Sequence, residues 1–386
     1  MKISGRIFLS TILLTFFLIS SCQSEEPIPS QQIEEVAAAP TEPVPTLIPT
    51  VEVATIEPST LTPIPTPIPT ITPVPTSTPL PTATPTPTHP LMVELMRQRE
   101  YPGSALTFVE QLDAGANFDR YIVSYESDGH TIFAVLNVPW GEPPATGWPV
   151  IIFNHGFIRP DQYVITQYYD SYMGVFSSNG YIVINSDYRG HGESEGEPII
   201  IYRDPGYVTD VLNALAAVKT YELADPNRVG MYGHSMGGFI ALRSMIISEE
   251  IKAGVLWGGV VANFDSIMNE WVMEDSERFE EIRTEWRNDW YGQYGSPEEN
   301  PEFWRAISSN SYLTDLSGPL QIHHATGDAV VPVAFSQTLQ AEMEAAGMPS
   351  ELFLYQGDDH NIAGNFWTAM QRSVAFFDQH VKAVGS

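Results

Sequence analysis

Basic residues and cysteine are both scarce in this sequence of 386 residues. It holds 18 Lys and Arg residues against 47 Asp and Glu, which gives a formal net charge of −29. Nucleic-acid binders need a basic surface to replace the counterions of phosphate, so this charge balance excludes that class. The single cysteine excludes an intramolecular disulfide framework and any Cys-rich zinc site.

The first 22 residues have the pattern of an export signal. A short basic head is followed by an apolar stretch from Ile7 to Ile19, which is shorter than the roughly 20 apolar residues of a transmembrane helix. The stretch ends in Ile-Ser-Ser-Cys at residues 19–22, which resembles the lipobox of bacterial lipoproteins and predicts lipid attachment at Cys22. The alternative is an ordinary secretory signal in which Cys22 is incidental. We therefore expect an exported, extracytoplasmic protein, which is lipid-anchored to the bacterial membrane or, without lipid, secreted.

Residues 23–90 are rich in proline and threonine, and 18 of the 32 prolines of the chain lie between Pro27 and Pro90. Closely spaced prolines remove backbone donors and favour polyproline II, so this segment cannot build a core. We predict a disordered linker at 23–90 and one folded domain at 91–386, which is long enough for a single buried α/β core.

Predicted strands and helices alternate in the folded domain. The strands are predicted at 120–127, 131–138, 150–154, 181–185, 228–232, 253–257, 319–323 and 351–355, and the helices at 163–178, 204–221, 237–247, 333–346 and 366–381. This alternation predicts an α/β fold, a mostly parallel sheet with helices on both faces. The first two strands form a hairpin around Asp128-Gly129 and are expected to supply the antiparallel edge.

One segment does not follow the alternation. Residues 262–311 are acidic and rich in aromatic side chains, and they lie between two predicted strands. We interpret them as a lid-like helical insert over the carboxyl ends of the strands, where ligands bind in open α/β sheets.

A candidate nucleophile lies in Gly233-His234-Ser235-Met236-Gly237. These residues follow a predicted strand, open a predicted helix and match the G-x-S-x-G nucleophile elbow. The glycines permit a sharp turn, which lifts the Ser235 hydroxyl out of the sheet near a helix N-terminus. The alternative is a surface serine in a glycine-rich turn.

A serine nucleophile needs a base and a carboxylate that orients the base. Asp328 follows the predicted strand 319–323, and His360 follows 351–355, so both should lie on the same rim of the sheet as Ser235. We predict a catalytic triad in which Asp328 holds the His360 tautomer and His360 takes the Ser235 proton. Other Asp and His residues fit this arrangement less well, because of the loop in which they lie or because of their order in the chain. They are Asp358, Asp359, His323, His324, His234 and His130.

The developing oxyanion needs two backbone donors. We predict the N–H of Met236, directly after the nucleophile, and the N–H of Phe157, in the loop that follows the strand 150–154. The alternative for the second loop is a plain strand-end turn. The loop after the next strand contains Asp187, Arg189 and His191, which we interpret as structural rather than catalytic residues.

These motifs resemble the catalytic domain of the prolyl-oligopeptidase family, of the dipeptidyl aminopeptidase and acylaminoacyl-peptidase type. The resemblance covers roughly residues 115–383 and is carried by Asp225 to Gly238, by 299–308, by 319–324, by Gly327-Asp328 and by Val331-Pro332. It implies an α/β-hydrolase fold and an acyl-enzyme on Ser235. The well-known peptidases of that family carry a β-propeller before this domain, where this chain has the Pro/Thr-rich segment.

The sequence therefore predicts a serine hydrolase that acts on small peptide or ester substrates. A carboxylesterase or deacetylase of small or polysaccharide esters is the alternative. An inactive hydrolase fold used as a binding module fits the intact Ser, Asp and His poorly. No metal and no organic cofactor are implied. The insert carries a group of acidic residues: Glu270, Glu274, Asp275, Glu277, Glu280, Glu281 and Glu285. One hypothesis is that their charge favours cationic substrates or free amino termini, and the alternative is a solvated helix face.

Overall fold

The computed structural model describes residues 88–271 and 277–383. The predicted signal segment with Cys22 and the predicted linker up to residue 87 lie outside the described residues, as do Glu274 and Asp275. The described residues all belong to one compact unit, Leu80–Ser386. None of their helices is both long enough and apolar enough to cross a membrane.

His89, two residues before the predicted start of the domain, already packs against the folded part of the chain. The His89 side chain is only 7% exposed, and its ring lies 5.0 Å from that of Trp290. Leu91 then accepts a hydrogen bond at its carbonyl from the buried Arg243 Nη1, at 2.7 Å. The packed part of the chain thus includes the last residues of the predicted linker.

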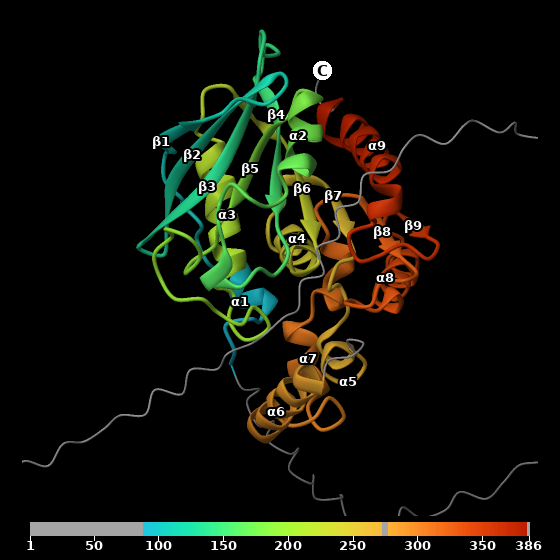
Figure 1. Cartoon of the computed structure of the whole chain (residues 1–386). Helices are drawn as coiled ribbons and strands as arrows, with labels where there is room; N and C mark the ends of the chain where they lie inside the picture. The colour runs from blue at the N-terminus through green and yellow to red at the C-terminus, as the bar shows by residue number, and fades with distance from the viewer. Residues whose placement is uncertain (1–87, 272–276, 384–386) are drawn as a thin grey trace, which may run out of the picture. The chain divides into compact units, whose positions relative to one another are not determined.

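Within the described residues, nine strands form one sheet in the order β1-β2-β3-β5-β4-β6-β7-β8-β9 (Figure 1). They are β1 (Thr107–Leu112), β2 (Phe118–Ser127), β3 (His130–Pro139), β4 (Trp148–Asn154), β5 (Ile182–Ser186), β6 (Ala224–His234), β7 (Ile251–Trp257), β8 (Leu320–Ala325) and β9 (Ser350–Tyr355). The strands from β5 to β9 pair in parallel, and the first three pair antiparallel with their neighbours. This is the mostly parallel sheet that the alternating pattern predicts.

The predicted hairpin is present, but it does not form the edge of the sheet. Asp128 and Gly129 connect β2 to β3 with φ angles of 55° and 78°, as a tight two-residue turn requires. The outer strand is β1, which the sequence analysis missed. Its side chains are almost all exposed, so it lacks the buried face that would produce an alternating pattern.

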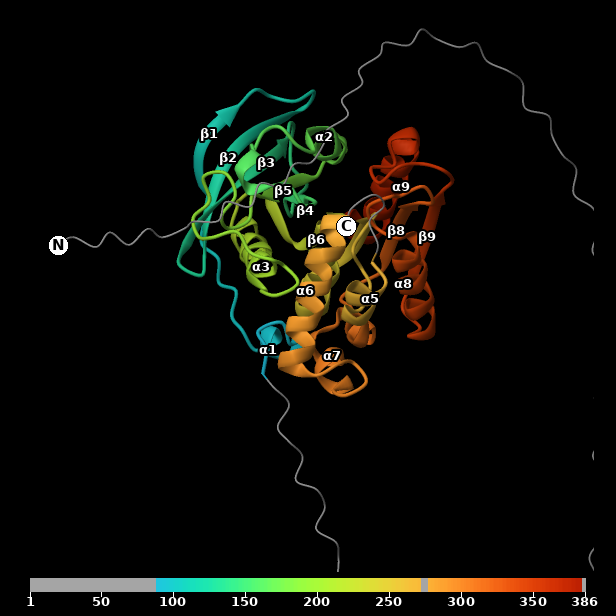
Figure 2. The ribbon, with the colours of Figure 1, turned by 60° about the horizontal axis from the view of Figure 1, so that its bottom comes forward.

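The helices are α1 (Val93–Arg97), α2 (Asp170–Ser178), α3 (Gly206–Val218), α4 (Met236–Ile247), α5 (Phe264–Asn269), α6 (Glu277–Tyr294), α7 (Pro301–Ile307), α8 (Val333–Ala345) and α9 (Phe366–Phe377). The buried side chains of α2 and α9 pack on one face of the sheet, and those of α3, α4 and α8 pack on the other (Figures 1 and 2). Short helical turns cover Pro160–Gln162, Ser309–Asp315, Ala363–Asn365 and Asp378–Lys382. Helices thus cover both faces, as predicted.

The helix predicted at 163–178 is wrong in its first half, because α2 begins only at Asp170. The tyrosines before it make tertiary contacts instead. Tyr163 is buried and donates a hydrogen bond from its hydroxyl to Asp187 Oδ1 at 2.7 Å. Tyr169, next to α2, has a φ of 63°, which no helix contains.

Three helices, α5 to α7, occupy the segment between β7 and β8 that was predicted as an insert, and Figure 2 shows α5 and α6 in front of the sheet. Their aromatic side chains form the inner side of the insert, where Phe264 and Trp290 stack at 5.9 Å. Trp271 Nε1 donates a hydrogen bond to the Val330 carbonyl at 2.8 Å. The insert therefore contacts the loop that follows β8.

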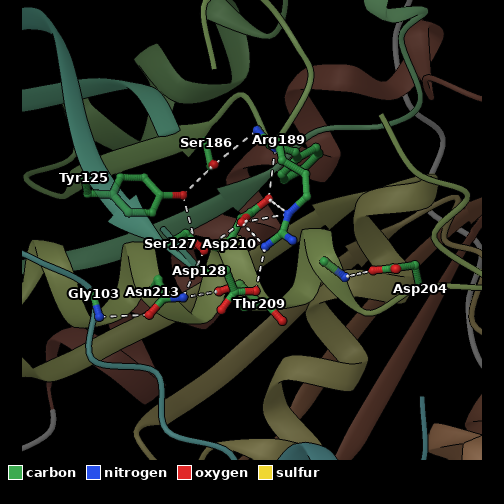
Figure 3. A network of polar contacts seen from close by, with 12 residues as sticks. Gly103, Tyr125, Ser127, Asp128, Ser186, Arg189, Asp204, Thr209, Asp210 and Asn213 are labelled. Atoms are coloured by element: carbon green, nitrogen blue, oxygen red, sulfur yellow. Dashed lines mark hydrogen bonds and ion pairs between the residues drawn. The ribbon is translucent and has the colours of Figure 1, made fainter. Parts of the chain in front are cut away.

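A buried polar network holds the loop after β5 to α3 (Figure 3). The Asp210 carboxylate accepts hydrogen bonds from the Arg189 guanidinium at 2.7 Å and from the Arg189 backbone N–H at 2.9 Å. The Ser127 hydroxyl donates to the same carboxylate at 2.7 Å. Arg189 also contacts Asp128 in the β2–β3 turn at 3.1 Å. These contacts agree with the structural role predicted for Arg189.

Candidate active site

The carboxyl ends of the central strands lie level with one another. Asn154 at the end of β4 pairs with Gly233, His234 at the end of β6 pairs with Trp257, and Trp257 pairs with His323 in β8. The loops that follow β4, β6, β7, β8 and β9 therefore leave the sheet at one rim. The residues that the sequence analysis selected for the triad and the oxyanion donors lie on these loops or, for Met236, at the start of the helix that follows β6.

Ser235 lies in a sharp turn between β6 and α4. Its φ of 56° and ψ of −119° are strained for a residue with a side chain, and such strain persists where surrounding contacts hold it. The backbone is too close for side chains on either side: a Cβ on Gly237 would lie 2.0 Å from the Asn154 oxygen, and one on Gly233 would lie 2.2 Å from the Gly237 oxygen. The structure thus forms the predicted elbow geometry at Ser235.

Asp328 and His360 contact each other as the predicted arrangement requires. His360 Nδ1 lies 2.7 Å from Asp328 Oδ2, and the other oxygen, Oδ1, accepts the N–H groups of Val330 and Val331 at 2.8 and 2.9 Å. Because Asp328 accepts at both oxygens, His360 donates from Nδ1, which leaves its Nε2 available to take a proton.

Asp328 has a further partner that the sequence analysis did not assign. His324 Nε2, in β8, lies 3.1 Å from Asp328 Oδ2. Burial would raise the pKa of Asp328, but hydrogen bonds from His324 and His360 outweigh it and hold the pKa below its usual value. His324 was set aside because it precedes Asp328 in the chain. Its spacing of four residues from Asp328 was the available signal.

The loop after β4 passes directly beside the nucleophile. A Cβ built on Gly156 would lie 3.1 Å from Ser235 Cβ, so a side chain there would crowd the nucleophile. The next residue is Phe157, and its N–H makes no hydrogen bond within the described part of the chain. Met236 is the first residue of α4, where N–H groups have no partner inside the helix. Both predicted oxyanion donors therefore have a free N–H on the rim.

The competing residues have other partners. The Asp358 carboxylate accepts the N–H groups of Gly364 and Asn365, and the Asp359 carboxylate accepts that of Asn361. His323 is fully buried between Gln321 and Tyr355, at 2.7 and 2.8 Å. His130 opens β3 beside the hairpin turn.

Two of the loop residues assigned to structure are buried. His191 contacts the Ile158 carbonyl at 3.2 Å, and Asp187 is enclosed with one oxygen bonded to Tyr163. Burial raises the pKa of Asp187 well above its usual value, although the Tyr163 hydrogen bond opposes this.

Across residues 88–271 and 277–383, no three His, Cys, Asp or Glu side chains gather as a metal site would require.

Comparisons with known proteins agree with this geometry. The sequence model of the prolyl oligopeptidase family matches residues 167–384. A probable dipeptidyl-aminopeptidase B of Aspergillus clavatus is 24% identical over 283 residues, which cover 67% of this chain and 28% of that protein. The chain thus spans under a third of that relative's length.

Two kinds of solved structure share the fold. The acylaminoacyl peptidase of Pyrococcus horikoshii superposes with a TM-score of 0.56 and 20% identity, over 70% of this chain and 43% of that one. An acetyl xylan esterase from Paenibacillus superposes with a TM-score of 0.55 and 18% identity, over 76% of this chain and 96% of that one. These likenesses confirm the predicted α/β-hydrolase fold.

Proposed function

The chain belongs to the prolyl oligopeptidase family, and we propose that it is a serine hydrolase that cleaves peptide or ester bonds through an acyl-enzyme on Ser235. The observation that carries this proposal is the 2.7 Å contact between His360 Nδ1 and Asp328 Oδ2, on the rim where Ser235 occupies its strained turn. A hydrogen-bonded His–Asp pair beside a nucleophile elbow has a direct use in acyl transfer.

The reaction follows from the positions of these groups. Ser235 Oγ attacks the substrate carbonyl while His360 Nε2 takes its proton, and Asp328 stabilises the resulting imidazolium. The negative charge on the carbonyl oxygen is met by the N–H groups of Met236 and Phe157. His360 then protonates the leaving group, and a water molecule hydrolyses the acyl-enzyme by the same steps in reverse.

The leaving group separates the two substrate classes. Amide cleavage demands protonation of a poor leaving amine, whereas ester cleavage does not. The esterase candidate is supported by the acetyl xylan esterase likeness, which extends over nearly all of that protein. The peptidase candidate is supported by the family and by the dipeptidyl-aminopeptidase relative.

A matched substrate series tests both candidates. The full chain and its Ser235→Ala variant are assayed on p-nitrophenyl esters and p-nitroanilides that carry the same acyl groups. Anilide cleavage that disappears with Ser235→Ala supports the peptidase, and ester cleavage without anilide turnover supports the esterase. A folded wild-type protein that neither turns over these substrates nor reacts with a fluorophosphonate would contradict the hydrolase proposal and favour the binding module.

We also propose that the protein is exported and anchored to the bacterial membrane by lipid on Cys22. Several acyl chains anchor a protein stably, where a single chain binds only marginally. In cell fractionation, we expect the wild-type chain in the membrane pellet and the Cys22→Ser variant in the soluble fraction. A Cys22→Ser variant that stays with the membrane would contradict lipid anchoring.

Steering of cationic substrates by the acidic insert has weaker support. Glu280 pairs with Arg283, and Glu281 pairs with Arg278, so part of the negative charge on α6 is already neutralised. This favours the solvated helix face. Equal kcat/KM values for cationic and neutral analogues at low salt would exclude steering, since the effect of surface charge is largest there.

A further inference from the structure

Tyr169 has a backbone conformation that calls for a physical reason. Its φ of 63° lies in the left-handed region, which bulky side chains rarely adopt. Such strain costs about 1–3 kcal/mol and persists where the surrounding contacts determine it, often at functional sites. The hydroxyl that this conformation places lies 3.0 Å from the Gly156 nitrogen and 2.7 Å from His234 Nδ1.

Chemistry fixes the direction of every hydrogen bond at this hydroxyl. The His360 carbonyl can only accept, so His234 Nε2, which lies 3.2 Å away, carries a proton and donates it. Burial, with a smaller effect of the nearby His360, lowers the pKa of His234 to about 3, so the ring is neutral and its Nδ1 accepts. The Tyr169 hydroxyl therefore donates to Nδ1, and its lone pairs accept the Gly156 N–H.

The four groups form one continuous chain, from Gly156 N–H through Tyr169 and His234 to the His360 carbonyl. Its two ends belong to the two loops that the proposed reaction needs, since Phe157 follows Gly156 and His360 is the base. Ser235 directly follows His234 in the sequence and lies beside the Gly156 end. A Cβ built on Gly156 would be 2.9 Å from Tyr169 Oη and 3.1 Å from Ser235 Cβ.

We propose that Tyr169 and His234 are positioning residues, whose hydrogen-bond chain holds the oxyanion loop at Gly156–Phe157 and the backbone of His360 at a fixed spacing around Ser235. The proposal rests on Ser235 as the nucleophile of the proposed function. Neither residue contacts the bond that breaks. Their removal therefore slows the chemical step and leaves binding of the reagent nearly unchanged.

Phosphorylation of Ser235 by diisopropyl fluorophosphate measures the rate of the chemical step without knowledge of the natural substrate. The Ser235 Oγ–P bond forms, the P–F bond breaks, fluoride leaves, and the Ser235 proton passes to His360. In the full chain, we expect Tyr169→Phe to lower the maximal rate of inactivation about 10- to 100-fold, with the reagent's half-saturating concentration unchanged. Tyr168→Phe is the matched control, because its hydroxyl contacts the exposed Gln162 carbonyl at 3.4 Å, and it should react at the wild-type rate.

Variants at His234 test whether the chain acts as a unit. His234→Ala should reproduce the loss, and His234→Gln should recover part of it, because its amide keeps an N–H donor for the His360 carbonyl. Combined with Tyr169→Phe, His234→Ala should slow the reaction no further than the more severe single variant. Multiplied losses in the double variant, or equal losses in Tyr168→Phe and Tyr169→Phe, would overturn the proposal.

A second measurement does not depend on reactivity. In ¹⁵N-histidine NMR of the full chain, His234 should hold its proton at Nε2 and show no titration between roughly pH 5 and 9. Tyr169→Phe should shift its Nδ1 resonance, and Tyr168→Phe should not. A His234 proton at Nδ1 would contradict the proposed hydrogen-bond chain, even if the enzyme were active. If wild-type Ser235 does not react with the fluorophosphate, the nucleophile assignment fails, and the NMR result still decides the hydrogen-bond chain.

Discussion

His324 Nε2 lies 3.1 Å from the same Asp328 oxygen that His360 Nδ1 contacts at 2.7 Å. Asp328 is almost completely buried, with 1% of its side chain exposed, so its charge depends on these donors rather than on water. His324 is fixed in turn, because its Nδ1 lies 2.7 Å from the Ser336 hydroxyl. His324 Nε2 also lies 3.0 Å from the Val331 carbonyl, so it contacts both this carbonyl and the carboxylate that holds the predicted base.

Asp328→Asn should lower kcat by roughly 10³- to 10⁴-fold with the fold intact, because an amide donor opposite His360 Nδ1 would select the wrong tautomer. Asp358→Asn is the control, since this carboxylate contacts backbone N–H groups of its own loop and does not contact His360. Steady-state kinetics on the p-nitrophenyl ester series measures both variants. Equal losses in the two would contradict the role assigned to Asp328.

His324→Leu should move acid unfolding to a higher pH. The pKa of Asp328 is depressed in the folded state, so its contribution to stability is present above its unfolded pKa of about 3.9 and is lost as the pH falls through the folded value. Without the His324 donor, the folded pKa lies closer to the unfolded one, so the variant is less stable than the wild type above about pH 3.9 and reaches its unfolding midpoint at a higher pH. Unfolding curves measured by circular dichroism between neutral pH and about pH 2 test this, and an unchanged acid midpoint would contradict it.

His323→Leu, one residue away, should instead make the fold more resistant to acid, and its effect should fall in a higher pH range. Burial, with a smaller effect of Arg372, lowers the pKa of His323 to about 3, so the folded state keeps this ring neutral while the unfolded state protonates it below about pH 6.5. The wild type therefore loses stability relative to His323→Leu as the pH falls from about 6.5 towards 3. The difference between their unfolding free energies should change by about 1.4 kcal/mol per pH unit. A constant difference across this range would show that His323 is not the group responsible.

The sequence predicted where the candidate residues of the rim lie, because each is at the end of a strand or in the loop that follows one. Ser235, Asp328 and His360 are far apart in the chain, but parallel strands end at one edge of the sheet, so their positions after predicted strands placed them on one rim. Tyr169 and His324 were not predicted to contribute to the site, because neither follows a strand. Tyr169 precedes a helix and His324 lies inside a strand, and only tertiary contacts bring their side chains to the site.

The errors in the fold have a similar cause. The start of α2 was placed too early because tertiary contacts hold the residues before it outside the helix: Tyr163 and Tyr169 contact the distant Asp187 and His234 respectively. Strand β1 was missed because its register is fixed by pairing with β2, and its exposed side chains carry no signal of burial.

Two tryptophans of the insert provide a matched test of how it attaches to the site. Trp271 Nε1 donates to the Val330 carbonyl at 2.8 Å, two residues from Asp328. Trp286 Nε1 is buried but has no hydrogen-bond partner within the described residues. Both lie near Tyr202, with ring centroids 5.8 and 5.5 Å from it.

Replacing each tryptophan with phenylalanine removes the same indole N–H from both positions. Trp271→Phe loses a hydrogen bond worth about 0.5–1.5 kcal/mol and leaves the Val330 carbonyl without this donor, whereas Trp286→Phe relieves an unsatisfied donor that costs about 1–3 kcal/mol. Both variants lose the same indole atoms, so the difference between them reports the hydrogen bonding together with the deeper burial of Trp271. We expect urea denaturation to find Trp271→Phe less stable than Trp286→Phe by at least about 1 kcal/mol. Because Val330 belongs to the Asp328 loop, Trp271→Phe should also lower kcat more than Trp286→Phe does. Equal stability and equal kcat in the two variants would show that the insert does not support that loop.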